Sequence, residues 1–274
     1  MQDKAEQFRA LHAGPPILVL PNAWDAATAR VFEVAGFPAV ATTSAGVAAA
    51  LGYPDGGAVP AREMIEAVAR IARAVKVPVT ADIEYAYAAT PDAVADVVLR
   101  VIAAGAIGIN LEDYVPGASD LEPISLQVDK IKSVIRAAAK AGVRVVMNAR
   151  TDIFLRQFGD ASARPGIAIE RGRAYLAAGA DCVFVPGVID VPTIRELVRG
   201  IGGPINILAV AGAPPIRELE SLGVARVSVG SGPMRATLAL VRDVADELKS
   251  RGTYEAFTSH ALLYDEVNEL MRTP

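Results

Sequence analysis

The chain has 274 residues, of which 52% are hydrophobic and 21% charged, and its formal net charge is -4 at pH 7. This composition is typical of a globular protein with a large core, and it gives no basic surface for nucleic acid. Apolar runs stay below the roughly 18 residues of a membrane span, so we expect no membrane segment. The single cysteine, Cys182, excludes an internal disulfide and fits a reducing compartment. The polar N-terminal stretch does not resemble a secretion signal, so a cytoplasmic location is expected.

Short runs of β-branched residues alternate with Ala-rich segments along the chain. Eight runs are predicted to be strands, at 17–22, 39–44, 78–84, 108–113, 144–152, 182–187, 205–211 and 226–231. Each precedes a predicted helix, at 24–35, 60–75, 91–104, 124–141, 167–178, 191–199, 214–222 and 233–250. Prolines such as Pro91 and Pro233 stand at helix starts, where a missing N–H does least harm. Glycines such as Gly105 and Gly179 follow helix ends.

Eight consecutive strand–helix units predict an α/β protein with a closed (β/α)8 TIM barrel, because strands that are apolar on both faces belong in a parallel sheet. Residues 1–252 are predicted to form this catalytic barrel as one domain. The segment 253–274 follows with apolar residues at roughly helical spacing. We expect an extra C-terminal helix, a helical arm that either packs on its own barrel or is swapped onto a neighbouring subunit of a homo-oligomer, a dimer or tetramer.

Polar side chains gather at the carboxyl ends of the predicted strands, which is where barrel enzymes keep their chemistry. The second to fifth strands end in Thr42, Thr43 and Ser44; Asp82 and Glu84; Glu112 and Asp113; and Asn148, Arg150 and Asp152. Alternation along a strand places Asp82 and Glu84 on one face. Several carboxylates in one cavity repel each other, and oxygen ligands without a nearby His or Cys favour Mg²⁺ or Mn²⁺. Asp82, Glu84 and Glu112 are therefore candidate metal ligands, and the alternative is a salt-bridge network with Arg150.

Arg150 is the candidate cation for a small-molecule carboxylate substrate, because its fork grips two oxygens at once. The alternative is an ion pair with Glu84 or Asp152, and both roles are compatible. The small residues that follow the second strand let backbone N–H groups approach an anion, although an ordinary turn has the same composition. Asn206, on the seventh strand, is a candidate hydrogen-bonding partner of the substrate.

Three loops carry further candidates. Asp55 lies in a Pro-Asp-Gly-Gly turn, where most Asp residues only shape the turn. Tyr85 and Tyr87 follow the third strand and are either proton donors under a closed lid or packing residues. The stretch 114–123 is either that lid or a static surface loop.

Five stretches together resemble the signature segments of the isocitrate lyase/phosphoenolpyruvate mutase superfamily. In chain order they are LPNAWDAATARVFEVAGFPAV, TTSAGVAAALGYPDGG, VPVTADIEYAYAATPDAV, GAIGINLEDY and NARTD. The resemblance implies a (β/α)8 barrel, Mg²⁺, and a 2-oxo or 2-hydroxy acid whose C–C or C–P bond is broken or made through a pyruvate-like enolate. It implies these site residues: Asp82, Glu84 and Glu112 around the metal, partly through waters; Asp55 near metal and substrate; and Thr43, Ser44, Ala45 and Arg150 on the substrate.

The chain departs from the better-known members of that superfamily. True isocitrate and methylisocitrate lyases carry an acid/base Cys in a Lys-Arg-Cys-Gly loop, and the loop after Glu84 has no Cys, so those two activities are not expected. The usual Gly-Tyr-Gly reads Ala86-Tyr87-Ala88, and because alanine resists positive φ, a glycine-based gating motion is not expected. Glu84 replaces the usual Asp. Pro186 stands where mutases have His and lyases have Glu, so a side branch is indicated.

These observations favour a Mg²⁺-dependent lyase that cleaves a C–C bond of a small 2-oxo or 2-hydroxy carboxylate. The alternatives are C–P chemistry on phosphonopyruvate, as mutase or hydrolase, and a non-catalytic metabolite-binding barrel. A glycine-rich turn at 227–233 resembles a phosphate-binding turn, but it does not explain the acids on the opposite strands.

Overall fold

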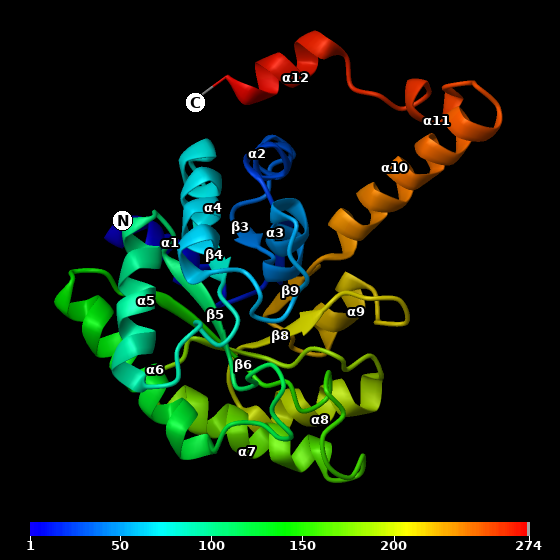
Figure 1. The fold of residues 1–274 in the computed structure, drawn as a ribbon. Coiled ribbons are helices and arrows are strands. Elements are labelled where there is room, and N and C mark those ends of the chain that lie inside the picture. Colours follow the sequence, from blue (N-terminus) through cyan, green and yellow to red (C-terminus); the bar gives the residue numbers. More distant parts are fainter. Residues whose placement is uncertain (273–274) are drawn as a thin grey trace.

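The structure, a computed structural model, describes residues 1–272. Its centre is one sheet of nine short parallel strands in the spatial order β1-β9-β8-β7-β6-β5-β4-β3-β2, with helices around it (Figure 1). The strands are β1 (Leu18–Leu20), β2 (Asn22–Ala23), β3 (Val40–Thr42), β4 (Val79–Asp82), β5 (Gly108–Glu112), β6 (Val146–Arg150), β7 (Cys182–Phe184), β8 (Ile205–Leu208) and β9 (Arg226–Ser228).

The first two strands, β1 and β2, are one barrel strand interrupted by Pro21. Proline has no N–H to give to a ladder, so the pairing changes partner there: β1 pairs with β9, and β2 pairs with β3. The Pro21 carbonyl still accepts a hydrogen bond from Ala41 N–H, at 2.9 Å. The sheet thereby closes with eight strands, and the predicted (β/α)8 barrel is confirmed.

Each predicted helix is present, with ends within a few residues of the prediction. They are α2 (Ala26–Val34), α4 (Ala61–Ala74), α5 (Pro91–Ala103), α6 (Ile124–Lys140), α7 (Arg164–Ala177), α8 (Val191–Ile201), α9 (Ile216–Ser221) and α10 (Gly232–Ser250). Two further helices, α1 (Gln2–Ala10) and α3 (Ser44–Leu51), were not predicted. Thr43 caps α3 by accepting from Gly46 N–H. A Cβ on Gly46 would lie 2.8 Å from Trp24 Cβ, so only glycine lets α3 pack this closely.

Helix α1 closes the N-terminal end of the barrel. Phe8 is fully buried there, and a Cβ on Gly108 would meet the Phe8 ring at 2.9 Å. With Phe8 pack the inward-facing residues Leu18, Leu20, Ala39, Ala41, Ile107 and Val146. The opposite end of the barrel, where the strands finish, is left for the site.

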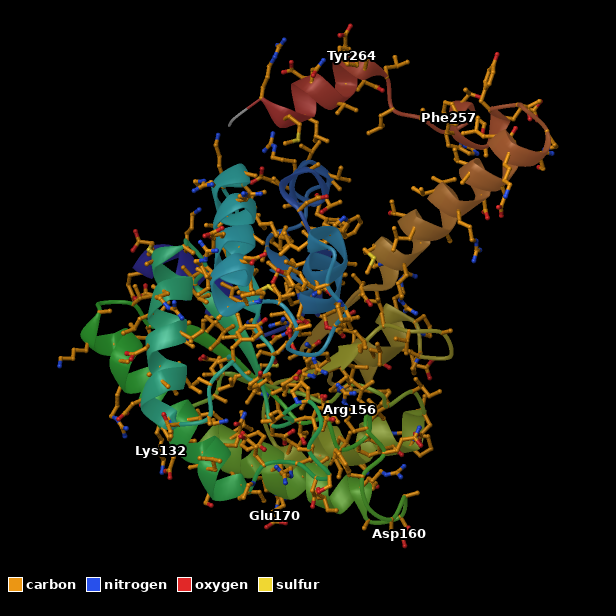
Figure 2. The ribbon with its side chains drawn as sticks, viewed as in Figure 1. Lys132, Arg156, Asp160, Glu170, Phe257 and Tyr264 are labelled. Atoms are coloured by element: carbon orange, nitrogen blue, oxygen red, sulfur yellow. The ribbon has the colours of Figure 1, made fainter. Side chains whose placement is uncertain are left out.

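The C-terminal arm leaves the barrel surface and returns to it. Helix α10 projects away, and α11 (Glu255–Thr258) and α12 (Tyr264–Met271) lead the chain back to α2 (Figure 1), where Arg30 Nε donates to Leu270 O at 2.8 Å. The expected single extra helix is therefore two short helices. Phe257 and Tyr264 stand clear of the barrel (Figure 2), and Tyr264 is 82% exposed.

The last two residues of the predicted arm, 273 and 274, lie outside the described residues. Within residues 1–272, no helix combines the length and apolarity that a membrane crossing requires.

Candidate active site

Asp82 is fixed at the end of β4 by the chain that follows β3. Its Oδ2 accepts hydrogen bonds from Ser44 N–H at 3.0 Å and from the Ser44 hydroxyl at 2.8 Å, and its own N–H donates to Thr42 Oγ1 at 2.9 Å. The prediction that Ser44 ends a strand is wrong, because Ser44 is the first residue of α3. A helix N-terminus presents N–H groups to an anion, and here that anion is the Asp82 carboxylate.

Glu84 comes close enough to Asp82 for the two charges to interact, but by a different route from the one predicted. Strand β4 ends at Asp82, so alternation does not place the two carboxylates together; Glu84 lies in a turn with φ of 53°. Ala86 and Tyr87 are left-handed as well, at 63° and 55°, so the expectation that alanine avoids this conformation here is wrong. Left-handed non-glycine residues store strain and gather at functional sites. The turn returns the Tyr87 hydroxyl to Glu84 Oε1, to which it donates at 3.1 Å.

Arg150 joins two carboxylates at the end of β6. Its Nη1 contacts Glu112 Oε2 at 2.8 Å, and its Nε and Nη2 donate to the two oxygens of Asp152 at 2.5 and 2.9 Å. The guanidinium also lies 5.8 Å from the Phe184 ring centroid. Of the predicted ion-pair partners, Asp152 is correct, and Glu112 takes the place expected of Glu84. The bidentate pair fixes the plane of the Arg150 fork.

Asp113, the other acid at the end of β5, does not join the site. It is fully buried and accepts hydrogen bonds from Arg171 Nη1 at 3.0 Å and from the Tyr175 hydroxyl at 2.7 Å, both from α7. Successive residues of a strand face opposite ways, so Glu112 points into the barrel and Asp113 points to the helices. Its role is to tie α7 to the barrel.

The carboxylates of the candidate site raise each other's pKa. Burial, then the charges of Asp82 and Asp55, raise the pKa of Glu84 to about 7. Burial and then Asp82 raise the pKa of Asp55. Burial raises the pKa of Glu112, against the opposing effect of Arg150. The site therefore holds more carboxylates than the guanidinium groups of Arg150 and Arg156 neutralise.

Unpaired oxygens support a cation near these carboxylates. Asp82 Oδ1 and Glu84 Oε2 are buried, and nothing within residues 1–272 donates a hydrogen bond to them, a costly state unless something else binds them. No three His, Cys, Asp or Glu side chains of residues 1–272 converge closely enough to ligate an ion without help. Mg²⁺ binds through one or two carboxylates and keeps several waters. The residues thus fit a hydrated hard cation and do not fit a fully protein-ligated one.

Segments that follow β3, β4 and β5 pack against one another at the candidate site. A Cβ on Gly57 would lie 3.1 Å from the Tyr85 hydroxyl and 3.5 Å from Pro116, and Gly57 has φ of 79°. Glycine is therefore required where the Asp55 turn packs against its neighbours. Asp55 itself is exposed, and its charge acts on Glu84 while that of Asp82 acts on it. Its predicted role near metal and substrate stays a prediction.

The predicted lid, 114–123, is anchored at both ends. Arg156 lies over the Tyr114 ring at 4.2 Å, and Tyr114 also contacts Phe158. At the other end, Lys130 Nζ donates to both oxygens of Glu122, at 2.7 and 2.6 Å. Whether this loop closes over a substrate stays a prediction.

The predicted substrate-binding residues lie in different settings. Thr43 is the N-cap of α3. Ala45, the second residue of that helix, is half-buried. Asn206 is fully buried inside the barrel, where its amide exchanges hydrogen bonds with the Ser228 hydroxyl at 3.2 and 3.3 Å. The substrate contacts of these residues stay predictions.

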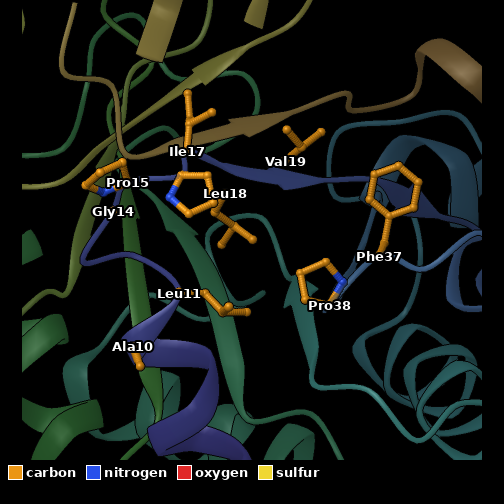
Figure 3. Close-up of a pocket in the computed structure, with 10 residues that line it drawn as sticks. Ala10, Leu11, Gly14, Pro15, Ile17, Leu18, Val19, Phe37 and Pro38 are labelled. Carbon is orange, nitrogen blue, oxygen red and sulfur yellow. The ribbon is translucent and has the colours of Figure 1, made fainter. Parts of the chain in front are cut away.

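A separate cavity of about 320 Å³ lies at the other end of the barrel (Figure 3). Its lining is apolar and includes Leu11, Pro15, Leu18, Phe37 and Pro38. These residues precede or begin β1 and β3, at the N-terminal end, whereas barrel enzymes bind substrate at the C-terminal end. The cavity therefore has no place in the chemistry of the carboxylates.

Comparison with known proteins identifies the family. A family model described as Phosphoenolpyruvate phosphomutase matches residues 8–249. "Uncharacterized protein Rv1998c" of Mycobacterium tuberculosis (strain ATCC 25618 / H37Rv) is 40% identical over 228 residues, 83% of this chain and 82% of that protein. The 2,3-dimethylmalate lyase of Eubacterium barkeri is 29% identical over 276 residues, 97% of this chain and 93% of the lyase. A crystal structure from Burkholderia cenocepacia J2315, described only as a lyase/mutase, has a TM-score of 0.92 at 34% identity and covers 100% of this chain and 97% of that one.

These matches confirm the expected superfamily and the expected enzyme class, since relatives with an assigned activity include this 2,3-dimethylmalate lyase and the 2-methylisocitrate lyase of Escherichia coli (strain K12). The chain belongs to the isocitrate lyase/phosphoenolpyruvate mutase superfamily, on a side branch of it.

Proposed function

We propose that this chain is a Mg²⁺-dependent lyase that cleaves a C–C bond of a small 2-oxo or 2-hydroxy carboxylate through a pyruvate-like enolate. Mn²⁺ is the alternative ion. The observation that carries the proposal is the pair of buried, donor-free carboxylate oxygens on Asp82 and Glu84 beside the oriented guanidinium of Arg150. Scission of a bond next to a ketone leaves negative charge on the enolate oxygen, and such a site places positive charge where it develops.

Each residue has a proposed task. Asp82 and Glu84, with Glu112 behind them, hold the hydrated ion, which would supply a Lewis acid for the substrate oxygens. Arg150 grips the substrate carboxylate with the fork that Asp152 orients. The resemblance assigns the helix N-terminus at 43–45 to the same carboxylate.

Tyr87 is the proposed proton donor in place of the missing loop cysteine. Burial, and then the charge of Glu84, raise the pKa of Tyr87 well above its usual value, so its hydroxyl stays protonated at neutral pH. A neutral phenol beside the acids can return a proton to the enolate carbon. Asp55 at the rim is the other titratable group proposed to act on the substrate.

The test is turnover of a panel of 2-oxo and 2-hydroxy acids, among them oxaloacetate, 2,3-dimethylmalate and malate homologues. Pyruvate, glyoxylate or the matching fragments should form with Mg²⁺ and stop forming with EDTA. Mg²⁺ without protein and an Asp82→Asn variant are the blanks, because metal ions alone decarboxylate oxaloacetate slowly. Equal rates for the wild type and this variant on every acid would exclude the proposed chemistry.

C–P chemistry on phosphonopyruvate is the second candidate, favoured by the description of the matching family model. Against it stands Pro186, which replaces the histidine of mutases in the resemblance. Phosphorus NMR of phosphonopyruvate incubated with protein and Mg²⁺ separates the two: a new phosphate or phosphoenolpyruvate signal selects C–P chemistry. The same acid panel with no product, but with saturable binding, would select a non-catalytic barrel.

The arm is proposed to join subunits of a homo-oligomer. Exposed apolar side chains on it include Tyr254, Phe257, Leu262, Leu263 and Tyr264. A large exposed apolar patch on a protein commonly marks an interaction surface. Light scattering should give a dimer or tetramer for the full chain and a smaller species for a chain ending at residue 252, the proposed domain boundary. A reducing, cytoplasmic setting is proposed from the buried single thiol of Cys182.

A further inference from the structure

Arg226 on β9 is a charged residue inside the barrel that the proposed chemistry does not use. Its side chain is fully buried, at the level where barrels usually carry branched apolar residues. The neighbouring interior positions are polar as well: Asn206 pairs with Arg226 across β8 and β9, and Asn110 pairs with Asn148 across β5 and β6. All three asparagines are buried. The barrel therefore has a polar interior layer that contains one guanidinium.

The Arg226 guanidinium has no ion-pair partner. Its Nη2 donates to Asn110 Oδ1 at 3.4 Å, whereas its Nε and Nη1 are buried without an acceptor. None of the ion pairs within residues 1–272 includes it. The Phe8 ring of α1 lies below it, 6.0 Å from Cζ. Burial lowers the pKa of Arg226 only to about 10, so it remains a cation at neutral pH.

A buried charge without a partner is strongly unfavourable unless other charges offset it. The acid whose charge acts on Arg226 is Asp82. Asn110 Oδ1, which Arg226 contacts, also accepts from Asn148 Nδ2 at 2.7 Å. Two residues further along the same two strands, on the same face, stand Glu112 and Arg150. Asp82 is the register partner of Asn110 on β4.

The carboxylates at the strand ends are in turn stabilised by a positive charge nearby. Glu112 and Asp152 share Arg150, and within residues 1–272 neither Asp82 nor Glu84 forms an ion pair. Carboxylates that no cation neutralises repel each other, so they either move apart or take up protons. A fixed positive charge in the low-dielectric interior acts over this range with little screening.

We propose that Arg226 is a positioning residue for the metal site: its buried positive charge holds the Asp82 carboxylate in place in the metal-free chain and lowers the affinity for the metal ion. This inference rests on the proposed Mg²⁺ site. Its consequence is a site that is preformed before the ion enters and releases the ion more easily than an all-acid cavity would.

Two substitutions separate charge from hydrogen bonding. Arg226→Gln removes the charge and keeps a donor for Asn110, and Arg226→Lys keeps the charge. Cys182→Ala, a buried neighbour of Arg226, serves as the packing control. Each purified chain is melted with and without saturating Mg²⁺, and its Mg²⁺ dissociation constant is measured by calorimetry, so the readout does not require turnover.

The R226Q chain should lose more thermal stability without Mg²⁺ than with it, and should bind Mg²⁺ several-fold more tightly than the wild type. The R226K chain should bind Mg²⁺ as the wild type does, and C182A should lose the same stability in both buffers. An R226Q chain whose loss and Mg²⁺ affinity match the C182A pattern would make Arg226 a packing residue. If R226Q folds at no Mg²⁺ concentration while R226K folds, the charge serves the barrel itself and the proposal is overturned. Absence of Mg²⁺ binding by the wild type would instead overturn the proposed function.

Discussion

Ser44 holds Asp82 by two hydrogen bonds to the same oxygen, Oδ2, one from its N–H at 3.0 Å and one from its hydroxyl at 2.8 Å. This arrangement leaves Oδ1 as the oxygen without a donor, and therefore as the one proposed to face the ion or its waters. The orientation of the carboxylate depends on a residue from the neighbouring βα loop.

Replacing Ser44 with Ala should weaken both Mg²⁺ affinity and kcat/KM by about 10-fold. A hydrogen bond to a charged group contributes about 1.5–3 kcal/mol, and the remaining N–H keeps the loss near the lower figure. Thr90→Ser, which retains the hydroxyl that caps α5, is the matched control and should change neither quantity. A variant that raises KM alone would place the Ser44 hydroxyl on the substrate, and the claimed support of Asp82 would be wrong.

Arg150→Lys should lower kcat/KM by about 10²–10³, the range seen when one donor to a developing oxyanion is removed. Lysine keeps the charge, but it cannot reproduce the fork that meets both Asp152 oxygens and Glu112 together. The matched control is Arg156→Lys, which loses only a stacking contact with Tyr114 and a longer contact to Asp152, 3.5 Å. Steady-state kinetics on the best acid of the panel gives the ratio. A loss smaller than that of Arg156→Lys would remove Arg150 from the substrate.

The barrel could be predicted because its signals are local. Each strand is a short apolar run, and proline and glycine mark the helix starts and ends. The helices missed from the sequence had weaker local signals. Helix α1 is polar along most of its length and buries only Ala5 and Phe8, so its contribution depends on the barrel floor that it meets. Helix α3 did have a local signal, the Thr43 cap and the left-handed Gly52 at its end. The prediction of a turn for this stretch missed that signal.

The acids of the candidate site were selected for a partly wrong reason. The rule that barrel chemistry lies at strand ends selected Asp82, Glu84 and Glu112, but strand alternation does not bring Glu84 in; a left-handed turn does. Such a turn is hard to predict in a stretch without glycine, because its strain is maintained by tertiary contacts. Arg226 could not be found at all from its alternating strand sequence. Only closure of the barrel decides that its side chain is inside.

Mg²⁺ binding should strengthen as pH rises through about 7. Glu84 in the metal-free chain has its pKa raised to about 7, so below that pH the ion must displace a proton and above it the carboxylate is ready. The Tyr87 hydroxyl stabilises the ionised form by donating to Oε1, so Tyr87→Phe should move the midpoint to higher pH. The midpoint is measured by calorimetric titration with Mg²⁺ at pH 6, 7 and 8, which extend about one pH unit on either side of the Glu84 pKa. Tyr85→Phe, on the adjacent ring 5.7 Å away, should leave it in place; equal midpoints for all three proteins would show that Glu84 does not control the site.

Stability should fall in acid through His12, which lies at the end of α1 under the barrel. Burial, and then the charge of Arg226, lower its pKa from 6.5 to about 4, and its Nδ1 forms a 2.9 Å hydrogen bond with Phe8 O. The unfolded chain takes up a proton near pH 6.5 and the folded chain only near 4, so this stability is complete above about pH 7 and is lost as pH falls toward 4. Between pH 7.5 and 5 the linkage amounts to about 2 kcal/mol. Asparagine at position 12 can still donate to Phe8 O but does not titrate. Urea unfolding of wild type and His12→Asn at both pH values should therefore show a larger acid loss for the wild type by that amount, whatever the two stabilities are at pH 7.5. The same acid loss in both proteins would mean that His12 accepts its proton without unfolding the floor of the barrel.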